Sequence, residues 1–424
     1  MNNKTVSAKR AFELMEKLGY ERVSCTEEEK RAAEELKQEA ASFGLDCTIE
    51  EFEVEAGAVK KAVFKVVEPY EQEYEITGFI RSASTPENGV DLDFVYAENA
   101  LEANLVGVEG KAILINGRFT LDAYERIQKA KPAAIITFSG TLIDELDKTD
   151  LDIRKIREIY TERHGENVLV NMRAFDALDI VKRGAKKVHI ELVSEQQTGI
   201  SRNVCGEIRG TEYPDEIVSF GAHFDSVYFS TGVYDNMSGS VIIMELARYF
   251  MANPPKRTLK FNWYGSEEQG LLGSKAYVKA HEEELKNHRL MINVDVAAPI
   301  LGKELIFTMG TEQLKHYADT MMKELGRAAV VEDDTYSSDS IPFADNGVPA
   351  INFCRFGAPG TAFIHDRYDN LKYGYMSAEA LDITLQNALE FSKRVINAPV
   401  FPIERKISDS MKEKVDKYLC KKKD

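Results

Sequence analysis

The spacing of apolar residues at the start of the chain predicts two helices followed by a strand. Residues 5–19 and 26–42 repeat apolar side chains at helical intervals, and residues 47–55 alternate apolar and polar side chains as a half-buried strand does. Thr26, with Glu29 three residues later, is typical of a capping box at the start of the second helix. We therefore expect two amphipathic helices that lead into a strand.

Short strand patterns characterise the next region, from about residue 61 to 195. A helical stretch at 121–131 lies between the last two of these patterns. Such a succession predicts a small α/β or β-rich unit. The expected strands cover 61–67, 91–97, 111–117 and 133–138.

From about residue 196 the pattern becomes a regular succession of strands and helices that continues to about residue 400. The strand segments are nearly continuous apolar runs, which are typical of strands buried in a central sheet. We expect strands at 216–222, 258–264, 290–296 and 349–354, helices at 237–251, 271–286, 311–325 and 378–396, and a terminal helix in 403–424.

Composition restricts the class of protein. The chain has 424 residues, 44% hydrophobic and 29% charged, which fits a soluble globular protein of two or three domains. Its 54 Lys and Arg face 70 Asp and Glu, and a net charge of −16 repels phosphate backbones, so no nucleic-acid partner is expected. No run of about 18 apolar residues occurs, so the sequence predicts no membrane span and no membrane partner.

The first residues and the cysteines favour a reducing compartment. Residues 1–20 lack the apolar core and the cleavage site of a secretory signal, which predicts a cytoplasmic protein. The cysteines are odd in number and lack the close spacing of zinc or redox motifs. They are expected to be free thiols, and they are Cys25, Cys47, Cys205, Cys354 and Cys420.

Polar residues follow several of the expected strands, where ligands bind in open α/β sheets. In chain order they are His223, Asp225, Asp235, Glu267, Glu268, Asp295 and His365. Each has an ordinary structural explanation when taken alone, since His223 can cap a strand end and Asp235 can cap a helix. The adjacent glutamates can be two solvated charges. Their order along the chain is what favours a functional site.

Two His and three of the carboxylates suit two zinc-class ions, each bound by one His, one carboxylate of its own and a carboxylate that both share. This set is His223, Asp235, Glu268, Asp295 and His365. Adjacent glutamates repel, so burial of Glu267 beside Glu268 favours a nearby cation, and one of the two can then accept a proton from water. Asp225 suits a carboxylate that holds the second imidazole nitrogen of His223. The other five His are expected to be structural or surface residues.

Seven segments carry or flank these residues in a consistent order. They are NVCGEIRG (203–210), VSFGAHFDSV (218–227), GVYDNMSGS (232–240), WYGSEEQGLLGS (263–274), INVDVA (292–297), SDSIPF (338–343) and FIHDRYDN (363–370). Together they resemble the co-catalytic zinc aminopeptidases of metallopeptidase family 28, which also contains dipeptidase-like carboxypeptidases and glutaminyl cyclases. The resemblance covers about residues 200 to 395, and residues 24–53 resemble the family's N-terminal helices and first strand.

The resemblance implies a role for each candidate residue. His223 and Asp295 would bind one metal and Glu268 and His365 the other, with Asp235 bridging the two. Glu267 would be the general base and acid, and Asp225 the carboxylate behind His223. Tyr336, whose loop precedes Ser338 and Asp339, is a candidate donor to the oxyanion of the substrate.

The resemblance also implies the architecture. The expected fold is α/β, with a mixed, mostly parallel sheet flanked by helices and an inserted β-rich domain like the protease-associated domain. The expected division is 1–60 for the N-terminal part of the peptidase domain, 61–195 for the insert, 196–402 for the metal-binding peptidase domain and 403–424 for a helical tail.

The expected function is removal of N-terminal residues from peptide substrates by an enzyme with two Zn²⁺ or other divalent cations per chain. A carboxypeptidase of the same fold would need a cation for the substrate carboxylate, for which Arg355 and Arg367 are candidates. A glutaminyl-cyclase-like enzyme would use one metal, and a non-catalytic relative would only bind. The chain has Ser338-Asp339-Ser340 where relatives often have Ser-Asp-His, which affects the expected substrate pocket. The oligomeric state stays open.

Overall fold

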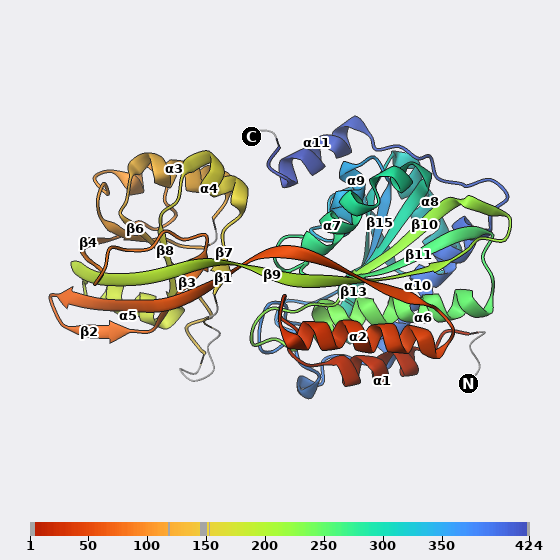
Figure 1. Ribbon diagram of the computed structural model, residues 1–424, viewed down its shortest axis with the longest axis horizontal. Coiled ribbons are helices and arrows are strands. Elements are labelled where there is room, and N and C mark those ends of the chain that lie inside the picture. The colour runs from red at the N-terminus through yellow and green to blue at the C-terminus, as the bar shows by residue number, and fades with distance from the viewer. Residues whose placement is uncertain (1–4, 118, 145–150, 152, 422–424) are drawn as a thin grey trace. The chain divides into compact units, whose positions relative to one another are not determined.

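The computed structural model describes residues 5–117, 119–144, 151 and 153–421. The chain divides into two compact units. The first consists of Met1–Val54 and Ile200–Asp424, and the second of Glu55–Gly199. Two strands, β1 (Cys47–Glu68) and β9 (Lys187–Ile208), begin in one unit and end in the other (Figure 1).

The continuity of β1 explains why its two halves look separate in the sequence. The alternating patterns at 47–55 and 61–67 are two parts of this one strand. Between them lie small residues such as Gly57, where an added Cβ would approach the Ile80 side chain to 3.0 Å. The close approach requires a small residue, and this interrupts the apolar alternation without interrupting the strand.

The first unit contains one sheet with helices on both sides. Its elements, in addition to β1 and β9, are α1 (Ala8–Leu18), α2 (Glu27–Ser42), β10 (Tyr213–His223), α6 (Ser238–Ala252), β11 (Arg257–Tyr264), α7 (Leu272–Ala280), β12 (His288–Val294), β13 (Gly302–Met309), α8 (Glu312–Glu324), β14 (Ala329–Glu332), α9 (Ser340–Asp345), β15 (Ala350–Gly357), α10 (Ala378–Asn397) and α11 (Asp409–Tyr418).

The strand order in this unit is β14-β13-β15-β12-β10-β11-β9. The central strands β11, β10, β12 and β15 are parallel to one another, as are β13 and β14. The β13/β15 and β11/β9 pairs are antiparallel. The expected mixed, mostly parallel α/β sheet is therefore confirmed.

Two apolar cores flank the sheet. Helices α1, α2 and α6 lie on one side of it and α7, α9 and α11 on the other (Figure 1). On the first side, residues such as Leu36, Phe250 and Leu385 belong to one large buried cluster. On the second side, Tyr277, Phe343 and Met411 belong to another. Because both faces are covered, the central strands are apolar along their whole length.

The start of α2 has half of the expected capping box. Thr26 Oγ1 accepts a hydrogen bond from the backbone N–H of Glu29 at 3.2 Å. The Glu29 carboxylate, however, accepts from the N–H of Cys25 rather than from that of Thr26, and also from the Ser201 hydroxyl. Glu29 is fully buried, so it connects the helix to β9 as well as capping it.

The second unit is a smaller α/β unit with its own apolar core. Its strands β4, β5, β6 and β8 are parallel to one another, β3 is antiparallel to β8, and β7 is parallel to β3. The elements that lie wholly within it are β2 (Gln72–Tyr74), β3 (Ile76–Ile80), β4 (Val90–Tyr96), β5 (Ala112–Leu114), α3 (Leu121–Ala130), β6 (Ala134–Ser139), β7 (Arg154–Lys155), α4 (Glu158–His164), β8 (Val168–Arg173) and α5 (Ala174–Lys182).

Two expected helices are shorter in the structure. The segment expected as one helix over 271–286 is α7 followed by a 3₁₀ helix, Glu282–Asn287. The expected tail helix in 403–424 is α11, and Lys422 and Lys423 lie outside the described residues. In residues 282–286, EEELK, only Leu285 is apolar and buried, so the segment offers too narrow an apolar face to continue an α-helix against the sheet, which accounts for the first difference.

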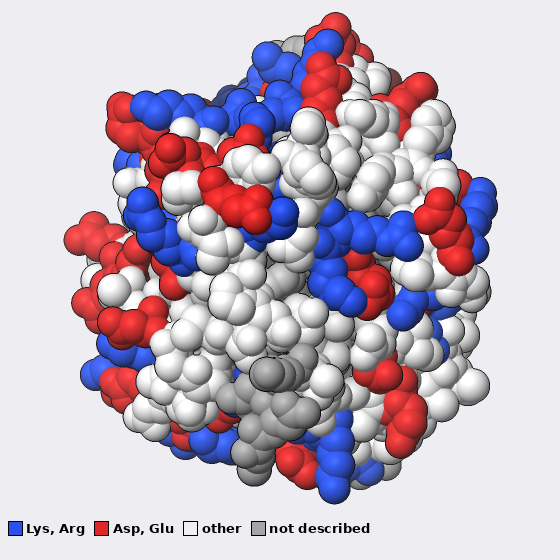
Figure 2. Space-filling view, turned by 90° about the vertical axis from the view of Figure 1, so that its right-hand side faces the viewer, with Lys and Arg blue, Asp and Glu red and all other residues white. Residues whose placement is uncertain are grey.

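Charged side chains of both signs intermingle on the face shown in Figure 2. The net charge of −16 is therefore not gathered into a single acidic field on this face. Among the described residues, no helix is both long enough and apolar enough to cross a membrane.

Candidate metal centre

The carboxyl ends of three neighbouring parallel strands bring most of the candidate residues together. His223 is the last residue of β10, which lies between β11 and β12. Glu267 and Glu268 follow the end of β11, and Asp295 follows the last residue of β12. Since the three strands run in the same direction, their ends lie at one edge of the sheet.

Asp235 reaches this edge from the turn Val233–Met237, which leads into α6. Gly232 precedes the turn with φ +52°, and an added Cβ there would lie 2.6 Å from Ser226 Cβ. The Asn236 side chain connects the turn to the end of β12, because it donates to Val294 O at 2.9 Å and accepts from the N–H of Val296 at 3.1 Å. The backbone of Asp235 is thereby fixed at the edge of the sheet.

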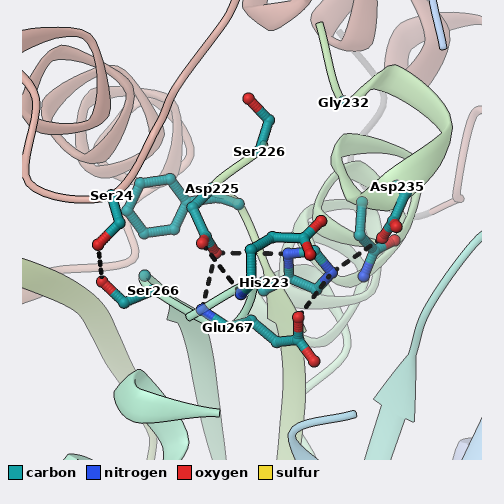
Figure 3. Close-up of polar contacts among 12 residues, drawn as sticks. Ser24, His223, Asp225, Ser226, Gly232, Asp235, Ser266 and Glu267 are labelled. Atoms are coloured by element: carbon teal, nitrogen blue, oxygen red, sulfur yellow. Dashed lines mark hydrogen bonds and ion pairs between the residues drawn. The ribbon is translucent and has the colours of Figure 1, made fainter. Parts of the chain in front are cut away.

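The two carboxylate oxygens of Asp235 face one candidate His each. Oδ1 lies 3.1 Å from His223 Nε2, and Oδ2 lies 3.1 Å from His365 Nε2. Asp235 therefore lies between the two imidazoles, as a bridging carboxylate would. Figure 3 shows the His223 ring between Asp235 and Asp225.

Each His also has a carboxylate of its own. His223 Nε2 is 3.7 Å from Asp295 Oδ1, and His365 Nε2 is 2.9 Å from Glu268 Oε2. The atoms form two groups, His223–Asp235–Asp295 and Asp235–Glu268–His365, and within each group one ligand atom per residue lies within 4.8 Å of the others. The donor set of imidazole nitrogens and carboxylate oxygens is one that zinc-class ions accept.

Two buried oxygens in these groups fit a bound cation. Glu268 Oε1 and Asp295 Oδ1 are buried and have no hydrogen-bond partner among the described residues. A buried carboxylate oxygen without a partner is unfavourable, and a divalent cation in each ligand group would satisfy the one that belongs to it. The residues present therefore fit a pair of metal ions.

Asp225 holds both His223 and the glutamate pair. Its Oδ1 lies 3.4 Å from His223 Nδ1 and accepts the N–H of Glu267 at 3.0 Å, while Oδ2 accepts the N–H of Glu268 at 3.2 Å (Figure 3). Asp225 is fully buried. One carboxylate therefore orients the imidazole and the backbone that carries both glutamates.

Glu267 belongs to neither group of ligand atoms found among the described residues. Its Oε2 lies 3.9 Å from His223 Nε2, and its side chain is 10% exposed. Burial, and to a lesser degree the neighbouring charge of Glu268, raises its pKa well above the ordinary value, against the influence of His223. Glu267 is thus a carboxylate beside the candidate ligands that is available for proton transfer.

The imidazoles respond to the surrounding negative charge. Glu268 is the strongest influence on His365 and raises its pKa to about 11. Burial would lower the pKa of His223, but the nearby carboxylates, Glu267 first among them, raise it well above its ordinary value. Burial would also raise the pKa of Asp235, yet its hydrogen bonds to the two His lower it. This part of the molecule attracts positive charge strongly.

Three buried residues next to the ligands were not among the functional candidates predicted from the sequence. Arg22 donates to the backbone carbonyl groups of Phe224 at 2.6 Å and of Gly232 at 3.0 Å, on either side of the loop between His223 and Asp235. Asp369 and Asp339 are the others. The last two lie inside segments that resemble the family, which is a signal that could have found them, whereas no local pattern marks Arg22.

Asp339 is a fully buried carboxylate whose two oxygens have no hydrogen-bond partner among the described residues. Burial raises its pKa to about 7, while the nearby His223 lowers it. Its electrostatic interactions reach His223, Asp225 and Asp295. Asp339 therefore adds one more acid to the same charged region.

The remaining candidates lie around this region. The Tyr336 ring stacks on Phe307 with centroids 5.3 Å apart. Burial raises the pKa of Tyr336, and the charge of Asp295 raises it further, so its hydroxyl group lies within the field of the ligands. Arg367 lies two residues after His365, with its guanidinium carbon 5.8 Å from the centre of the Phe229 ring.

Arg355 differs from the expectation for a carboxylate-binding residue. It is 7% exposed, and its Nη1 lies 3.1 Å from Glu304 Oε1. Its Nε donates to Pro299 O at 2.8 Å. These groups already use the guanidinium, which argues against Arg355 as the residue that holds a substrate carboxylate.

Comparisons with known proteins agree with this geometry. Residues 203–392 match the sequence model of Peptidase family M28. Aminopeptidase YwaD of Bacillus subtilis (strain 168) is 32% identical over 176 residues, which are 40% of this chain and 38% of that protein. A Glutamate carboxypeptidase 2 homolog of Caenorhabditis briggsae is 31% identical over 200 residues, 40% of this chain and 26% of that protein. The matched part thus spans well under half of these relatives.

A solved structure extends the similarity of the fold to nearly the whole chain. BSAP, a zinc aminopeptidase from Bacillus subtilis, superposes with a TM-score of 0.76 at 21% identity, covering 96% of this chain and all of that one. The family match begins within β9 and ends in α10, and it includes every residue of the two ligand groups. The segment 203–392, which carries both groups of ligand atoms, therefore matches peptidase family M28.

Proposed function

We propose that the protein is a two-metal aminopeptidase that removes N-terminal residues from peptides. The observation that carries the proposal is the position of Asp235, whose two oxygens lie 3.1 Å from His223 and from His365. A carboxylate between two His groups, each with a second carboxylate, is the arrangement of a paired-metal site. The proposed ligands are His223, Asp235, Glu268, Asp295 and His365, for two Zn²⁺ or other divalent cations.

When bound, the two cations would polarise the scissile carbonyl group and lower the pKa of water at the site. Glu267 then accepts a proton from the attacking water at its side-chain oxygen and transfers it to the nitrogen of the leaving amine. Asp225 keeps Glu267 in place through its backbone N–H and keeps His223 in its orientation. Tyr336 is proposed to donate a hydrogen bond from its hydroxyl group to the developing oxyanion.

The acidic surroundings favour a substrate with a free α-amino group. Asp225, Asp235, Glu267, Glu268 and Asp295 bring five carboxylates, and two divalent cations would leave the site close to neutral or slightly negative. A substrate ammonium group is attracted to such a site. A carboxypeptidase would instead need a cation for the substrate carboxylate, and Arg355 is already occupied by Glu304.

The matched Glutamate carboxypeptidase 2 homolog makes the direction of cleavage worth testing directly. The experiment is a panel of amino-acyl chromogenic substrates with free and blocked N-termini, together with peptides that have free and amidated C-termini. We expect hydrolysis of free N-terminal substrates, inhibition by chelator and recovery with Zn²⁺. Cleavage of N-blocked peptides that depends on a free C-terminal carboxylate would contradict the aminopeptidase proposal.

The number of metal ions separates the proposal from a glutaminyl-cyclase-like enzyme. Two ligand groups that share Asp235 favour two ions over one. Elemental analysis of the protein purified without chelator should give close to two divalent metals per chain. A value near one, unchanged by added Zn²⁺, would favour the single-metal alternative.

A further inference from the structure

His365 lies in the least regular part of the proposed metal site. Residues 363–370 form neither helix nor strand, and the His365 side chain is 36% exposed with a backbone φ of +53°. The other ligands follow buried strands or precede a buried helix. Some other contact must therefore hold this loop where His365 can face Asp235.

Asp369, four residues after His365, provides that contact. It is fully buried, whereas Ile364 in the same loop is exposed. Its Oδ1 accepts the backbone N–H of Tyr234 at 2.7 Å, and its Oδ2 accepts the N–H of Asp235 itself at 3.0 Å. Both carboxylate oxygens therefore bind consecutive amide groups of the turn that carries the bridging residue.

The backbone of Asp369 adds a third connection to the same turn. The Thr231 hydroxyl donates to the carbonyl oxygen of Asp369 at 2.7 Å. Within the loop, Asp369 N–H donates to Asp366 O at 3.0 Å, and Tyr368 N–H donates to Asp366 Oδ1 at 2.8 Å. The segment between Asp369 and His365 is thus a tight turn, so the position of Asp369 restricts that of the imidazole.

Arg22 supplies a buried positive charge near this buried negative one. It is fully buried and donates to the carbonyl groups of Thr231 at 2.7 Å and of Gly232 at 3.0 Å. Burial raises the pKa of Asp369 to about 8, whereas the hydrogen bonds from the Tyr234 and Asp235 amide groups and the charge of Arg22 lower it. The carbonyl groups of Thr231 and Gly232, which precede Asp235, thus accept from the Arg22 guanidinium, and the amide groups of Tyr234 and Asp235 donate to the Asp369 carboxyl group.

We propose that Asp369 is a positioning residue that sets the separation of Asp235 and His365 and thereby forms the Asp235–Glu268–His365 site for a divalent cation. The inference rests on the proposed metal site and extends it. Asp369 touches no ligand atom; it acts through the backbone of Asp235 and through the loop of His365. Residues that orient metal ligands typically change metal affinity about 10–100-fold when they are replaced.

The test is a chelator titration of the zinc-loaded full-length protein, with release of Zn²⁺ followed by a fluorescent indicator. In Asp369→Asn the amide keeps one acceptor but turns an N–H₂ donor towards a backbone N–H. We expect two release steps in the wild type. In the variant the more weakly held Zn²⁺ should be released at an about 10–100-fold lower chelator concentration, while the other step moves less.

Glu245→Gln is the matched control. Glu245 is a buried carboxylate, 2% exposed, that also accepts a backbone N–H, from Ser7 at 2.9 Å, and it pairs with Arg10. This variant should lower the thermal unfolding midpoint yet keep both zinc-release steps. If it weakens Zn²⁺ binding as much as Asp369→Asn does, metal loss merely follows lost stability and the positioning role is refuted.

A milder variant keeps the test decisive if Asp369→Asn fails to fold. Thr231→Val removes the hydroxyl group that donates to the Asp369 carbonyl, and we expect it to weaken the same Zn²⁺ several-fold. Unchanged release in the folded variant, or in both variants, would overturn the inference. A wild-type protein that holds fewer than two Zn²⁺ ions would instead overturn the proposed function, so the two failures are distinguishable.

Discussion

At the scale of single residues, the adjacent carboxylates Glu267 and Glu268 lie in different surroundings. Glu268 faces His365 at 2.9 Å, whereas Glu267 lies outside both groups of ligand atoms found among the described residues. Asp225 binds the backbone N–H of both and so fixes the direction in which each side chain leaves the turn. The two adjacent glutamates thus suit the two different roles proposed for them, Glu268 as a metal ligand and Glu267 as the proton acceptor.

Replacement of Glu267 tests this division. Glu267→Gln removes the proton acceptor but keeps the shape of the side chain and the ligand groups. We expect kcat to fall by about 10²–10⁴-fold while the metal content stays at the wild-type value. Steady-state kinetics and elemental analysis on the same preparation check both parts, with the exposed Glu283→Gln as a control that should change neither.

Loss of metal from Glu267→Gln would show that Glu267 is a ligand. Near-normal turnover would show that another group accepts the proton, and the raised pKa of the buried Asp339 makes that residue the first to examine. Either result would reassign the residue while leaving the bridging position of Asp235 intact.

At the scale of elements, the strands of the first unit were predictable and its connections were less so. Four of these strands are buried on both faces, and their continuous apolar runs predict them from the sequence; they are β10, β11, β12 and β15. Strand β13, Gly302–Met309, lies between β14 and β15 and contains the buried Glu304, a charged residue that hides the strand in the sequence. Burial of Glu304 depends on Arg355, Thr384 and Asn387, and partners so distant in sequence leave no local trace.

The same reasoning applies to the site. The candidate ligands were predictable because they follow strands and because their order resembles a family. Arg22 and Asp369 hold the connecting loops through distant backbone carbonyl and amide groups. Asp369 lies in a segment that resembles the family and Arg22 does not, but the contacts of both residues become visible only when the fold brings residues 22, 235 and 369 together.

The junction of α7, the 3₁₀ helix and β12 has a predictable pH response. His288 is fully buried, its Nδ1 lies 2.8 Å from Ser219 Oγ, and its Nε2 lies 3.6 Å from Glu284 Oε2. Glu284 also pairs with Lys260 at 3.0 Å. The interaction with His288, the largest influence, and that with Lys260 lower the pKa of Glu284 to about 2, although burial opposes them.

Because the folded-state pKa of Glu284 lies below that of the unfolded chain, its contribution to stability is present above about pH 4.5 and is lost as the pH falls towards 2. Burial also lowers the pKa of His288, so the unfolded state takes up its proton first and stability begins to fall below about pH 6.5.

We expect Glu284→Gln to lower the free energy of unfolding at pH 7 and to differ less from wild type near pH 3. Urea denaturation at several pH values measures this, and the exposed Glu282→Gln is the control; a difference that grows as the pH falls would contradict the assignment.

At the scale of the whole molecule, all proposed ligands belong to the first unit, which includes Ile200–Asp424, and none to Glu55–Gly199. The surroundings of the proposed site also join segments from residue 22 to residue 369. A ligand that binds only the folded state stabilises it by RT ln(1 + [L]/Kd), which is about 2.7 kcal/mol at a hundredfold excess over Kd. Bound cations would therefore stabilise one unit selectively.

Metal removal should reveal this difference in hydrogen exchange. After chelator treatment of the protein, we expect faster amide exchange in 232–237, 265–271 and 361–370, because these segments carry ligands and lack strand pairing of their own. Exchange in α3, β6 and β8 of the second unit should stay the same. Mass spectrometry of peptic fragments measures both units in one sample, and added Zn²⁺ should restore the slow exchange. Equally faster exchange in both units would show that the metals stabilise the whole chain rather than one unit. Unchanged exchange in these segments would contradict metal binding by their residues.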